Sequence, residues 1–544
     1  MQVGSVNGTY SRVRFLLILI AATAAAQPTA VIQERTHRSQ VMAGARAYRV
    51  YLPPAYATSR AARYPVIYWF HGYEAENEGR DRAFAAYVGT HPVIVVDSGP
   101  ADSTGQFPLY FPELIEHIDQ TLRTIADRDH RAVTGAAAGG FLAIWQAAKC
   151  PDLVGSASSF GATLEAPAGP RGFEVDSDLS DLYPTLEGVR IRQVAAATSL
   201  AETLDFHLDA FAHPLPKPAA FHHDDPYPNF GVWDWEVVSD RRRPGFTVLE
   251  NVSRAGFRCT VREWIPAGAA LPEVKLSIAS ARIYTPGAVY PVTYIRLRDG
   301  KVRRTTLKAN ANGRLSFDLD GDACEIGIGA AAGVALSGFE IEGAAWVATG
   351  QPVQVRLKFW NKGGARSATI RLEWESPTPG VKFKTATARL SSLAPGESAT
   401  LPVTFTMARA GVSGARIVAV DGEIRLSIDV PVYPAAPAFA DYRIADGLTV
   451  PPYSHPLGEG NGDGHAAPGE SFAVLVPDAG AMRAAELFTN DACVDNTVRI
   501  SEAGTRISLP AIRATCEPGH RIRMLARVGL NYFALEIPVW YRNP

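Results

Sequence analysis

A short glycine-rich turn carries the residue pattern in this sequence that is nearest to a catalytic one. Residues 134–140 read TGAAAGG, between an apolar run typical of a strand and the helix-like run 141–149. Serines that attack carbonyl carbons occur in the pattern G-x-S-x-G at such a strand-to-helix turn, because the tight turn exposes the hydroxyl group. Gly135, Gly139 and Gly140 supply the glycines, but the serine position holds Ala137. A methyl group cannot attack a carbonyl, so the sequence predicts a turn without its nucleophile.

The elements around this turn are typical of a parallel sheet. Between about residues 35 and 270, continuous apolar runs such as 65–70 and 92–96 alternate with helix-like segments such as 111–125. Strands that are apolar on both faces and separated by helices indicate a mostly parallel sheet covered on both sides. The sequence therefore predicts an α/β domain over residues 35–270.

Six stretches of this domain together resemble the putative-esterase family of α/β-hydrolases, which includes esterase D-like, acetyl xylan and feruloyl esterases. The matching stretches are residues 64–72 (YPVIYWFHG), 111–119 (FPELIEHID), 131–135 (RAVTG), 139–141 (GGF), 147–153 (AAKCPDL) and 155–159 (GSASS). Each is weakly specific alone, and together they favour this fold. The resemblance implies a carboxylic ester hydrolase domain.

The resemblance also implies a histidine base in a loop after the sheet and an acid that orients it. One of His222 and His223, which two aspartates follow, is the favoured base, and a surface turn is the alternative for this HHDD segment. His207 and His213 are weaker candidates. The aspartate that the family shows after a late strand is missing from residues 192–202.

Substitutes for the missing acid and the missing serine are present but weakly supported. Glu202 and Asp205 follow the expected position of the acid, yet a charge near the start of a solvated helix explains each residue equally well. Ser156, Ser158 and Ser159 end a later predicted strand, and we expect them to be structural rather than nucleophilic.

The oxyanion hole consists of backbone N–H groups, so its formation does not depend on the missing hydroxyl. By resemblance, its donors are the amides of Tyr73 and Ala138, with His71 and Gly72 shaping the first loop. Loss of a triad serine lowers the rate of such enzymes about a million-fold. A pocket that keeps these donors without a nucleophile binds a ligand and does not cleave it.

The sequence changes character near residue 271, where strands of alternating polarity replace the helices. Glycine, proline, asparagine and aspartate punctuate these strands every 8–12 residues or so, as is typical of β-sandwiches. The pentapeptide APGES occurs at 394–398 and at 467–471, each time before a predicted strand, which indicates two related modules. We expect a small β unit at 271–330 and sandwiches that resemble immunoglobulin-like modules at 334–433 and 437–544.

The N-terminus predicts export. Arg12 and Arg14 precede the short apolar run 15–21, and the small residues 23–26 fit a signal-peptide cleavage site. The run is shorter than the roughly 18 residues that a membrane span needs. We therefore expect residues 1–26 to be a signal peptide, and the mature chain to be secreted or periplasmic without an integral membrane span.

Charge and cysteine content narrow the expected partners. A net charge of −2, with both signs interspersed, argues against a nucleic-acid partner.

Of the five cysteines, Cys493 and Cys516 are placed to form a disulfide in an oxidising compartment. No histidine or cysteine group has metal-ligand spacing, so we expect no metal ion and no cofactor. Residues 461–464 (NGDG) before Glu470 indicate a turn, and a calcium site stays the open alternative.

These features favour a secreted pseudo-hydrolase that binds an ester-bearing or glycan ligand at the turn around Ala137. One alternative is an active carboxylic or carbohydrate ester hydrolase with an unidentified nucleophile. The other is an adhesion or scaffold protein that acts through its β-sandwiches.

Overall fold

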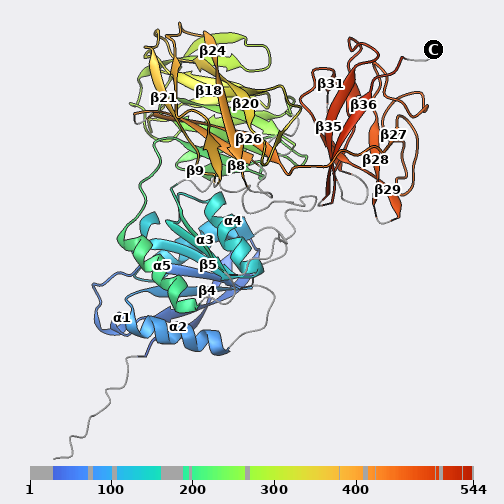
Figure 1. The fold of residues 1–544 in the computed structure, drawn as a ribbon. Coiled ribbons are helices and arrows are strands. Elements are labelled where there is room, and N and C mark those ends of the chain that lie inside the picture. Colours follow the sequence, from blue (N-terminus) through green and yellow to red (C-terminus); the bar gives the residue numbers. More distant parts are fainter. Residues whose placement is uncertain are drawn as a thin grey trace, which may run out of the picture.

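The computed structural model of the chain shows an N-terminal α/β domain joined to three β-sheet modules (Figure 1). The structure describes residues 29–71, 78–100, 107–160, 188–194, 199–263, 270–378, 380–408, 414–422, 424–478, 480–495, 498–500, 506–529 and 531–541. The expected signal peptide and Tyr73 lie outside the described residues. No helix among the described residues is both long enough and apolar enough to cross a membrane.

The α/β domain is built on a seven-stranded sheet with the order β1-β2-β4-β3-β5-β6-β7. Strands β4, β3, β5, β6 and β7 pair in parallel, whereas β2 pairs antiparallel with both β1 and β4. The elements are β1 (Val31–Ser39), β2 (Gly44–Leu52), α1 (Ala55–Thr58), β3 (Val66–His71), α2 (Glu78–Thr90), β4 (Ile94–Pro100), α3 (Phe107–Thr121), η1 (Arg128–His130), β5 (Arg131–Ala136), α4 (Ala138–Lys149), β6 (Ser156–Phe160), β7 (Arg190–Val194) and α5 (Leu200–Ala212).

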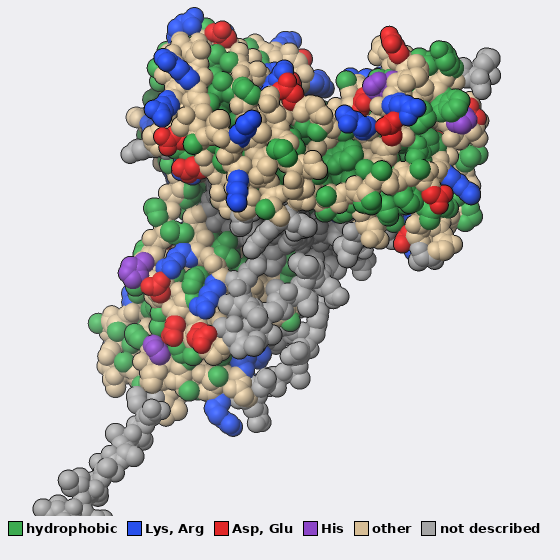
Figure 2. All heavy atoms as spheres, viewed as in Figure 1, with side chains coloured by type: hydrophobic (Ala, Val, Ile, Leu, Met, Phe, Trp, Pro, Cys, Tyr) green, Lys and Arg blue, Asp and Glu red, His purple; other side chains and the backbone are tan. Residues whose placement is uncertain are grey.

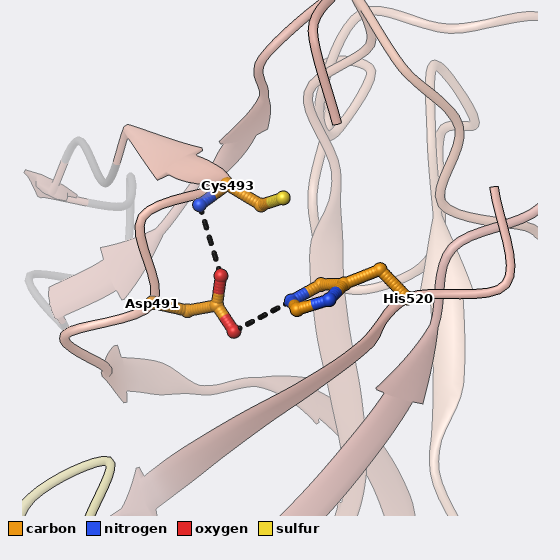
Figure 3. Close-up of side chains that lie close together, drawn as sticks. All are labelled: Asp491, Cys493 and His520. Atoms are coloured by element: carbon orange, nitrogen blue, oxygen red, sulfur yellow. Dashed lines mark hydrogen bonds and ion pairs between the residues drawn. The ribbon is translucent and has the colours of Figure 1, made fainter. Parts of the chain in front are cut away.

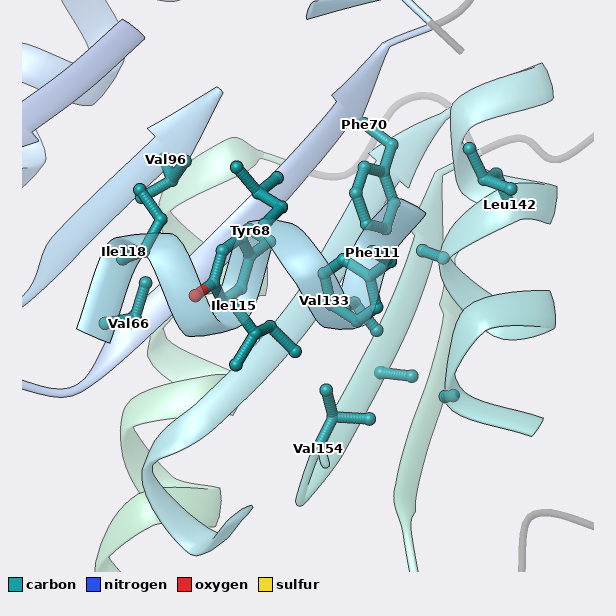
Figure 4. Packing of buried hydrophobic residues seen from close by; sticks show 14 of the residues in the cluster. Val66, Tyr68, Phe70, Val96, Phe111, Ile115, Ile118, Val133, Leu142 and Val154 are labelled. Carbon is teal, nitrogen blue, oxygen red and sulfur yellow. The ribbon is translucent and has the colours of Figure 1, made fainter. Parts of the chain in front are cut away.

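Helices cover both faces of this sheet. Successive side chains of a strand point to opposite faces, so Val66, Tyr68 and Phe70 of β3 pack against α3 and α4 (Figure 4). Ile67 and Trp69 of the same strand join the second core, to which α2 and α5 contribute. The apolar run in the sequence is continuous because both faces of β3 are buried.

The α/β domain ends near residue 220, not at the predicted residue 270. Strands β8–β12 pair with β13–β17 in two sheets, ordered β16-β13-β10-β9 and β15-β14-β17-β12-β11-β8, which enclose one core. The strands are β8 (Phe221–Asp225), β9 (Phe230–Val232), β10 (Trp235–Ser239), β11 (Phe246–Ser253), β12 (Gly256–Arg262), β13 (Lys275–Ala279), β14 (Val289–Arg296), β15 (Val302–Lys308), β16 (Ser316–Asp320) and β17 (Cys324–Ile328).

The error in the predicted domain boundary has a physical cause. Strands β11 and β12 are buried along almost their whole length, so they lack the alternation that distinguishes a half-exposed sandwich strand. The predicted unit 271–330 is therefore the second half of a larger module, residues 221–328, which we call the first β module.

Residues 334–433 form the second β module, a pair of sheets around one core. The sheet orders are β18-β20-β24-β22 and β19-β26-β25-β21-β23. The strands are β18 (Val334–Glu342), β19 (Val347–Ala348), β20 (Val353–Asn361), β21 (Ile370–Glu375), β22 (Val381–Phe383), β23 (Thr387–Leu390), β24 (Ser398–Met407), β25 (Gly414–Asp421) and β26 (Ile424–Tyr433).

The third β module follows residue 437 and lies beside the second (Figure 1). Its sheets are β27-β28-β29, β30-β35-β36, β31-β34 and β32-β33. The expected disulfide between Cys493 and Cys516 is present. The strands are β27 (Arg443–Ala445), β28 (Ala473–Asp478), β29 (Ala481–Ala484), β30 (Glu486–Phe488), β31 (Val494–Asp495), β32 (Val498–Ile500), β33 (Arg506–Ser508), β34 (Ala511–Ile512), β35 (Arg521–Val528) and β36 (Asn531–Pro538).

A buried ion pair joins the first two β modules. The Lys362 ammonium group, just after β20, lies 2.6 Å from a carboxylate oxygen of Glu325 in β17. The side chains of both residues are at most 6% exposed. A buried charge that loses its partner is strongly destabilising, so each residue depends on the other.

Replacement of Lys362 by methionine leaves the Glu325 carboxylate buried without its cation. We expect a loss of about 3–5 kcal/mol in the free energy of unfolding, measured by urea denaturation of the full chain. The matched control is Arg356→Met, which breaks the largely exposed pair with Glu342 and costs less than about 1 kcal/mol. Equal effects of the two variants would contradict the importance of the buried pair.

Candidate active-site turn

The turn between β5 and α4 has the backbone of a nucleophile elbow. Ala137 has φ 48° and ψ −121°, a region that non-glycine residues rarely adopt and that costs about 1–3 kcal/mol. Its N–H donates to the carbonyl of Phe160 in β6, and its carbonyl accepts the N–H of Phe141 in α4. The chain therefore keeps the strained turn in which a nucleophile would be exposed, with a methyl group in place of the hydroxyl.

The glycines of the turn are required by the close approach of β5 to α4. A Cβ atom on Gly135 would lie 2.4 Å from the carbonyl oxygens of Phe70 and Gly139. A Cβ atom on Gly140 would lie 3.0 Å from the carbonyl oxygen of Gly135 and 3.1 Å from Cβ of Ser159. Gly135 therefore admits no side chain, and a Cβ atom on Gly140 would force its neighbours to move by a few tenths of an ångström, so packing explains these two glycines of the pattern.

The turn leaves a possible anion-binding group at the start of α4. Ala138 is the first residue of this helix, where backbone N–H groups have no partner within the helix and the helix dipole is positive. Ala136, Ala137 and Ala138 are partly exposed at the carboxyl ends of the parallel strands, which is where ligands bind in open α/β sheets. Tyr73, the other expected donor, lies outside the described residues.

His222 does not lie at this turn. Its Nε2 atom is 2.8 Å from the hydroxyl of Ser427 in β26, and the residue is 4% exposed. The histidine is therefore part of the contact between the first and second β modules. Asp224 lies two residues further along the same strand. Burial, and then the nearby charges of Asp429 and Glu250, raise the pKa of Asp224 to about 8.

His223 lies at the opposite end of α4 from Ala137. Its Nε2 atom is 3.1 Å from Oδ2 of Asp225, which in turn lies 2.6 Å from the ammonium group of Lys149. Burial alone would raise the pKa of Asp225, but the Lys149 charge and the His223 hydrogen bond outweigh it and lower that pKa. Lys149 ends α4, whose 12 residues span about 18 Å. The predicted pairing of His222 or His223 with the turn is thus not found.

His207 is enclosed in a network of hydroxyl groups. Its Nδ1 and Nε2 atoms each lie 2.8 Å from a serine hydroxyl, those of Ser156 and Ser158. The Ser158 hydroxyl donates to Thr134 in β5. Burial, with a smaller contribution from Arg192, lowers the pKa of His207 to about 3. With both ring nitrogens occupied and no exposed surface, this histidine and its serines are structural.

The acid candidates also have structural partners. The N–H of Glu202 donates to the hydroxyl of Ser199, the N-cap of α5, so Glu202 is a helix-start charge. Asp205 accepts the hydroxyl of Tyr87 and joins α5 to α2. His213 follows α5 and lies 3.0 Å from Asp209 at an exposed position.

The other histidines of the α/β domain lie away from the turn as well. His37 and His117 stack on each other beside β1, which is four positions from β5 in the sheet order. His91 follows α2, and His130 precedes β5 at the end opposite the turn. The chain has twelve histidines, and only His71 has a side chain outside the described residues. Among the side chains that the structure describes, no histidine lies at the turn.

The NGDG segment forms a turn closed by a buried carboxylate. The Asp446 side chain, with no exposed surface, accepts the N–H groups of Gly462, Asp463 and Gly464. Because backbone donors occupy both oxygens of Asp446, this geometry favours the turn over the calcium site.

Comparison with known proteins supports the family resemblance. Residues 111–193, from α3 into β7, match the family model described as "Putative esterase", which confirms the resemblance predicted from the sequence. No curated protein matches the chain.

Solved structures of esterases are similar to part of the chain. A ferulic acid esterase is 22% identical with a TM-score of 0.23, and the match covers 27% of this chain and 62% of that one. S-formylglutathione hydrolases of Staphylococcus aureus and Agrobacterium tumefaciens are each 16% identical, with TM-scores of 0.27 and 0.26. Those matches cover 34% of this chain and 86% and 96% of the respective hydrolases. The chain thus spans less than two thirds of the ferulic acid esterase.

Replacement of Gly135 by alanine is expected to destabilise the α/β domain by about 3 kcal/mol, the upper end of the range for overpacking, because two backbone oxygens cannot move away from the new methyl group. Thermal unfolding of the purified protein measures the loss. The control is Gly44→Ala in β2, where the new Cβ would meet its nearest atom at 3.8 Å. An unchanged unfolding temperature in Gly135→Ala would show that the turn is looser than described.

Proposed function

We propose that this member of the putative-esterase family is an exported pseudo-hydrolase that binds an ester-bearing or glycan ligand at the turn around Ala137. The observation that carries the proposal is a retained elbow that has no nucleophile and, among the side chains that the structure describes, no histidine partner. The serine of the hydrolytic mechanism is therefore missing, and no described histidine is placed to act as its base.

The position of the described histidines away from the turn is as important to this proposal as the replacement of the serine. A general base must approach the nucleophile to about 2.6–3.2 Å or act through one water molecule. His207 is occupied by two serines, His222 by Ser427 and His223 by Asp225. Each of these interactions serves packing of the domain or its attachment to the β modules, so none leaves the histidine available to the turn.

The capacity to bind does not depend on the missing groups. The Ala138 amide at the start of α4 is an electrostatically favourable donor for a carbonyl or other negatively polarised oxygen. The packing of Gly135 and Gly140 holds this amide in place whether or not a serine precedes it. An ester, or a sugar that carries one, supplies such an oxygen.

The surface agrees with a small-molecule or glycan ligand better than with a nucleic acid. On the face in Figure 2, Lys and Arg side chains are interspersed with Asp and Glu side chains over the α/β domain and the β modules. Nucleic-acid binding needs a basic patch or stripe, and that face has none among the residues drawn in colour.

A second candidate function, carbohydrate adhesion through the β modules, is favoured by an aromatic pair on the third module. Trp540 and Tyr541 are 48% and 77% exposed, and the Trp540 ring stacks on His465 with 4.3 Å between centroids. Exposed aromatic rings provide apolar faces against which sugars pack. In this case Trp540→Ala would abolish polysaccharide binding and changes at Ala137 would not.

Restoring the serine alone should not restore catalysis. We expect Ala137→Ser, like the native protein, to give no turnover and no burst with p-nitrophenyl acetate, because none of the histidines whose side chains the structure describes is in place to activate the hydroxyl. The readout is release of p-nitrophenol, with Ala136→Ser as the matched variant one residue away. Turnover that appears in Ala137→Ser alone would mean that a base does reach the turn. Turnover by the native protein would favour the active hydrolase.

Filling the turn should block ligand binding. We expect Ala137→Leu to weaken binding of acetylated xylo-oligosaccharides or methyl ferulate at least tenfold, about 1.4 kcal/mol, in isothermal titration calorimetry. The control is Ala43→Leu, because Ala43 also has a positive φ (50°) but is exposed in the β1–β2 turn. Equal binding by the two variants would show that the ligand does not bind at this turn.

A further inference from the structure

Two segments of the third β module bring metal-ligand atoms together beside the disulfide. Ligand atoms of Asp491, Cys493 and His520 all lie within 4.8 Å of one another (Figure 3). The disulfide adds a fourth side chain, because Sγ of Cys516 is bonded to Sγ of Cys493. The spacing in the sequence does not reveal this group, because Asp491 and Cys493 come from one segment and Cys516 and His520 from another, more than twenty residues later.

The three residue types of this cluster, cysteine, histidine and aspartate, are among those that bind zinc. Zinc takes cysteine sulfur at about 2.3 Å and histidine nitrogen or carboxylate oxygen at about 2.0–2.2 Å, in tetrahedral sites. Ligand atoms of one zinc ion therefore lie roughly 3–4 Å apart. The ligand atoms of Asp491, Cys493 and His520 lie at most 4.8 Å apart, and Asp491 and His520 are already in contact at 2.8 Å, so side-chain rotation is enough to bring these separations to the range of a zinc site.

We propose that Cys493, Cys516, Asp491 and His520 form a zinc site when the disulfide is reduced. A dithiol supplies two electrons and two protons: the S–S bond breaks, Cys493 and Cys516 become thiols, and the dithiol is oxidised to its own disulfide. Zinc then binds both sulfurs as thiolates and releases the two protons. In the oxidised protein the sulfurs are bonded to each other, and no thiolate is present to bind the metal.

Backbone hydrogen bonds join the two segments of the cluster in addition to the disulfide. Strand β31, which starts one residue after Cys493, pairs with β34, which ends four residues before Cys516. The N–H of Arg513 donates to the carbonyl of Cys493, and the N–H of Val539 donates to the carbonyl of His520. These contacts remain available to hold the two segments together after the S–S bond is reduced.

Asp491 and His520 are already oriented toward the same point. Nε2 of His520 lies 2.8 Å from Oδ2 of Asp491, and Oδ1 of Asp491 accepts the N–H of Cys493 (Figure 3). The second contact fixes the carboxylate from behind, as outer hydrogen bonds do in metal sites. A zinc ion between Asp491 and His520 would replace their direct contact and leave the backbone contact intact.

Charge and access fit a divalent cation. Two thiolates and one carboxylate carry three negative charges, which a divalent ion reduces to one. The side chains of His520 and Asp491 are 39% and 17% exposed, so an ion reaches the cluster from solvent. The nearby cation Arg513 is directed to Asp495 by an ion pair and does not occupy the cluster. The site would let the module exchange a covalent cross-link for a metal cross-link.

The test is zinc binding by the full chain with and without reduction by a phosphine, which adds no competing thiol. The oxidised protein keeps Cys150, Cys259 and Cys324 as thiols, so it controls for zinc bound at those cysteines. We expect the reduced protein to bind one more zinc ion than the oxidised protein. With Co²⁺ as the probe, we expect the visible absorption of a tetrahedral thiolate site only after reduction.

Variants separate this site from general thiol binding. We expect His520→Ala and Asp491→Asn each to weaken zinc binding at least about tenfold, whereas the control His465→Ala binds zinc like the native protein. Circular dichroism of each reduced variant checks that the module is folded. Equal zinc content before and after reduction would overturn the proposal. So would native-like affinity of His520→Ala, because zinc would then be held by cysteines alone.

Discussion

The close approach of β5 to α4 is the constraint on which the rest of the α/β domain depends. Two carbonyl oxygens would lie 2.4 Å from any Cβ atom at Gly135, so the strand and helix meet almost backbone to backbone. At this contact Ala137 has a positive φ, and the Ala138 amide lies at the helix start. Packing thus stabilises the turn whether or not a serine is present.

Helix α4 links this turn to the β modules through its other end. The chain leaves the seven-stranded sheet after α5 and enters the first β module, carrying His222 and His223 with it. Lys149 at the end of α4 then meets Asp225 and His223 in a buried cluster. His222 and His223, the base candidates that the family resemblance implies, are thus part of the contacts between domains.

The contact between the first two β modules is polar as well as buried. Asn251 exchanges hydrogen bonds with the backbone of Ser427, whose hydroxyl lies beside His222. Lys362 and Glu325 add an ion pair with almost no exposure. Such groups stabilise one orientation only, because any other orientation would leave buried polar atoms without partners. The first two β modules are therefore held in one specific arrangement relative to each other.

The sequence by itself determined the parallel strands, the turn at Ala137 and the resemblance to putative esterases, because each depends on local residue patterns. It also indicated the Cys493–Cys516 pair, because these two of the five cysteines are only 23 residues apart. It did not determine the domain boundary near residue 220, since β11 and β12 are buried on both faces by neighbouring sheets and so have no sandwich alternation. The sequence also did not predict where His222 and His223 lie, or that Asp491 lies next to His520. Those positions depend on which sheet a strand joins, and that choice is made by packing between segments distant in sequence.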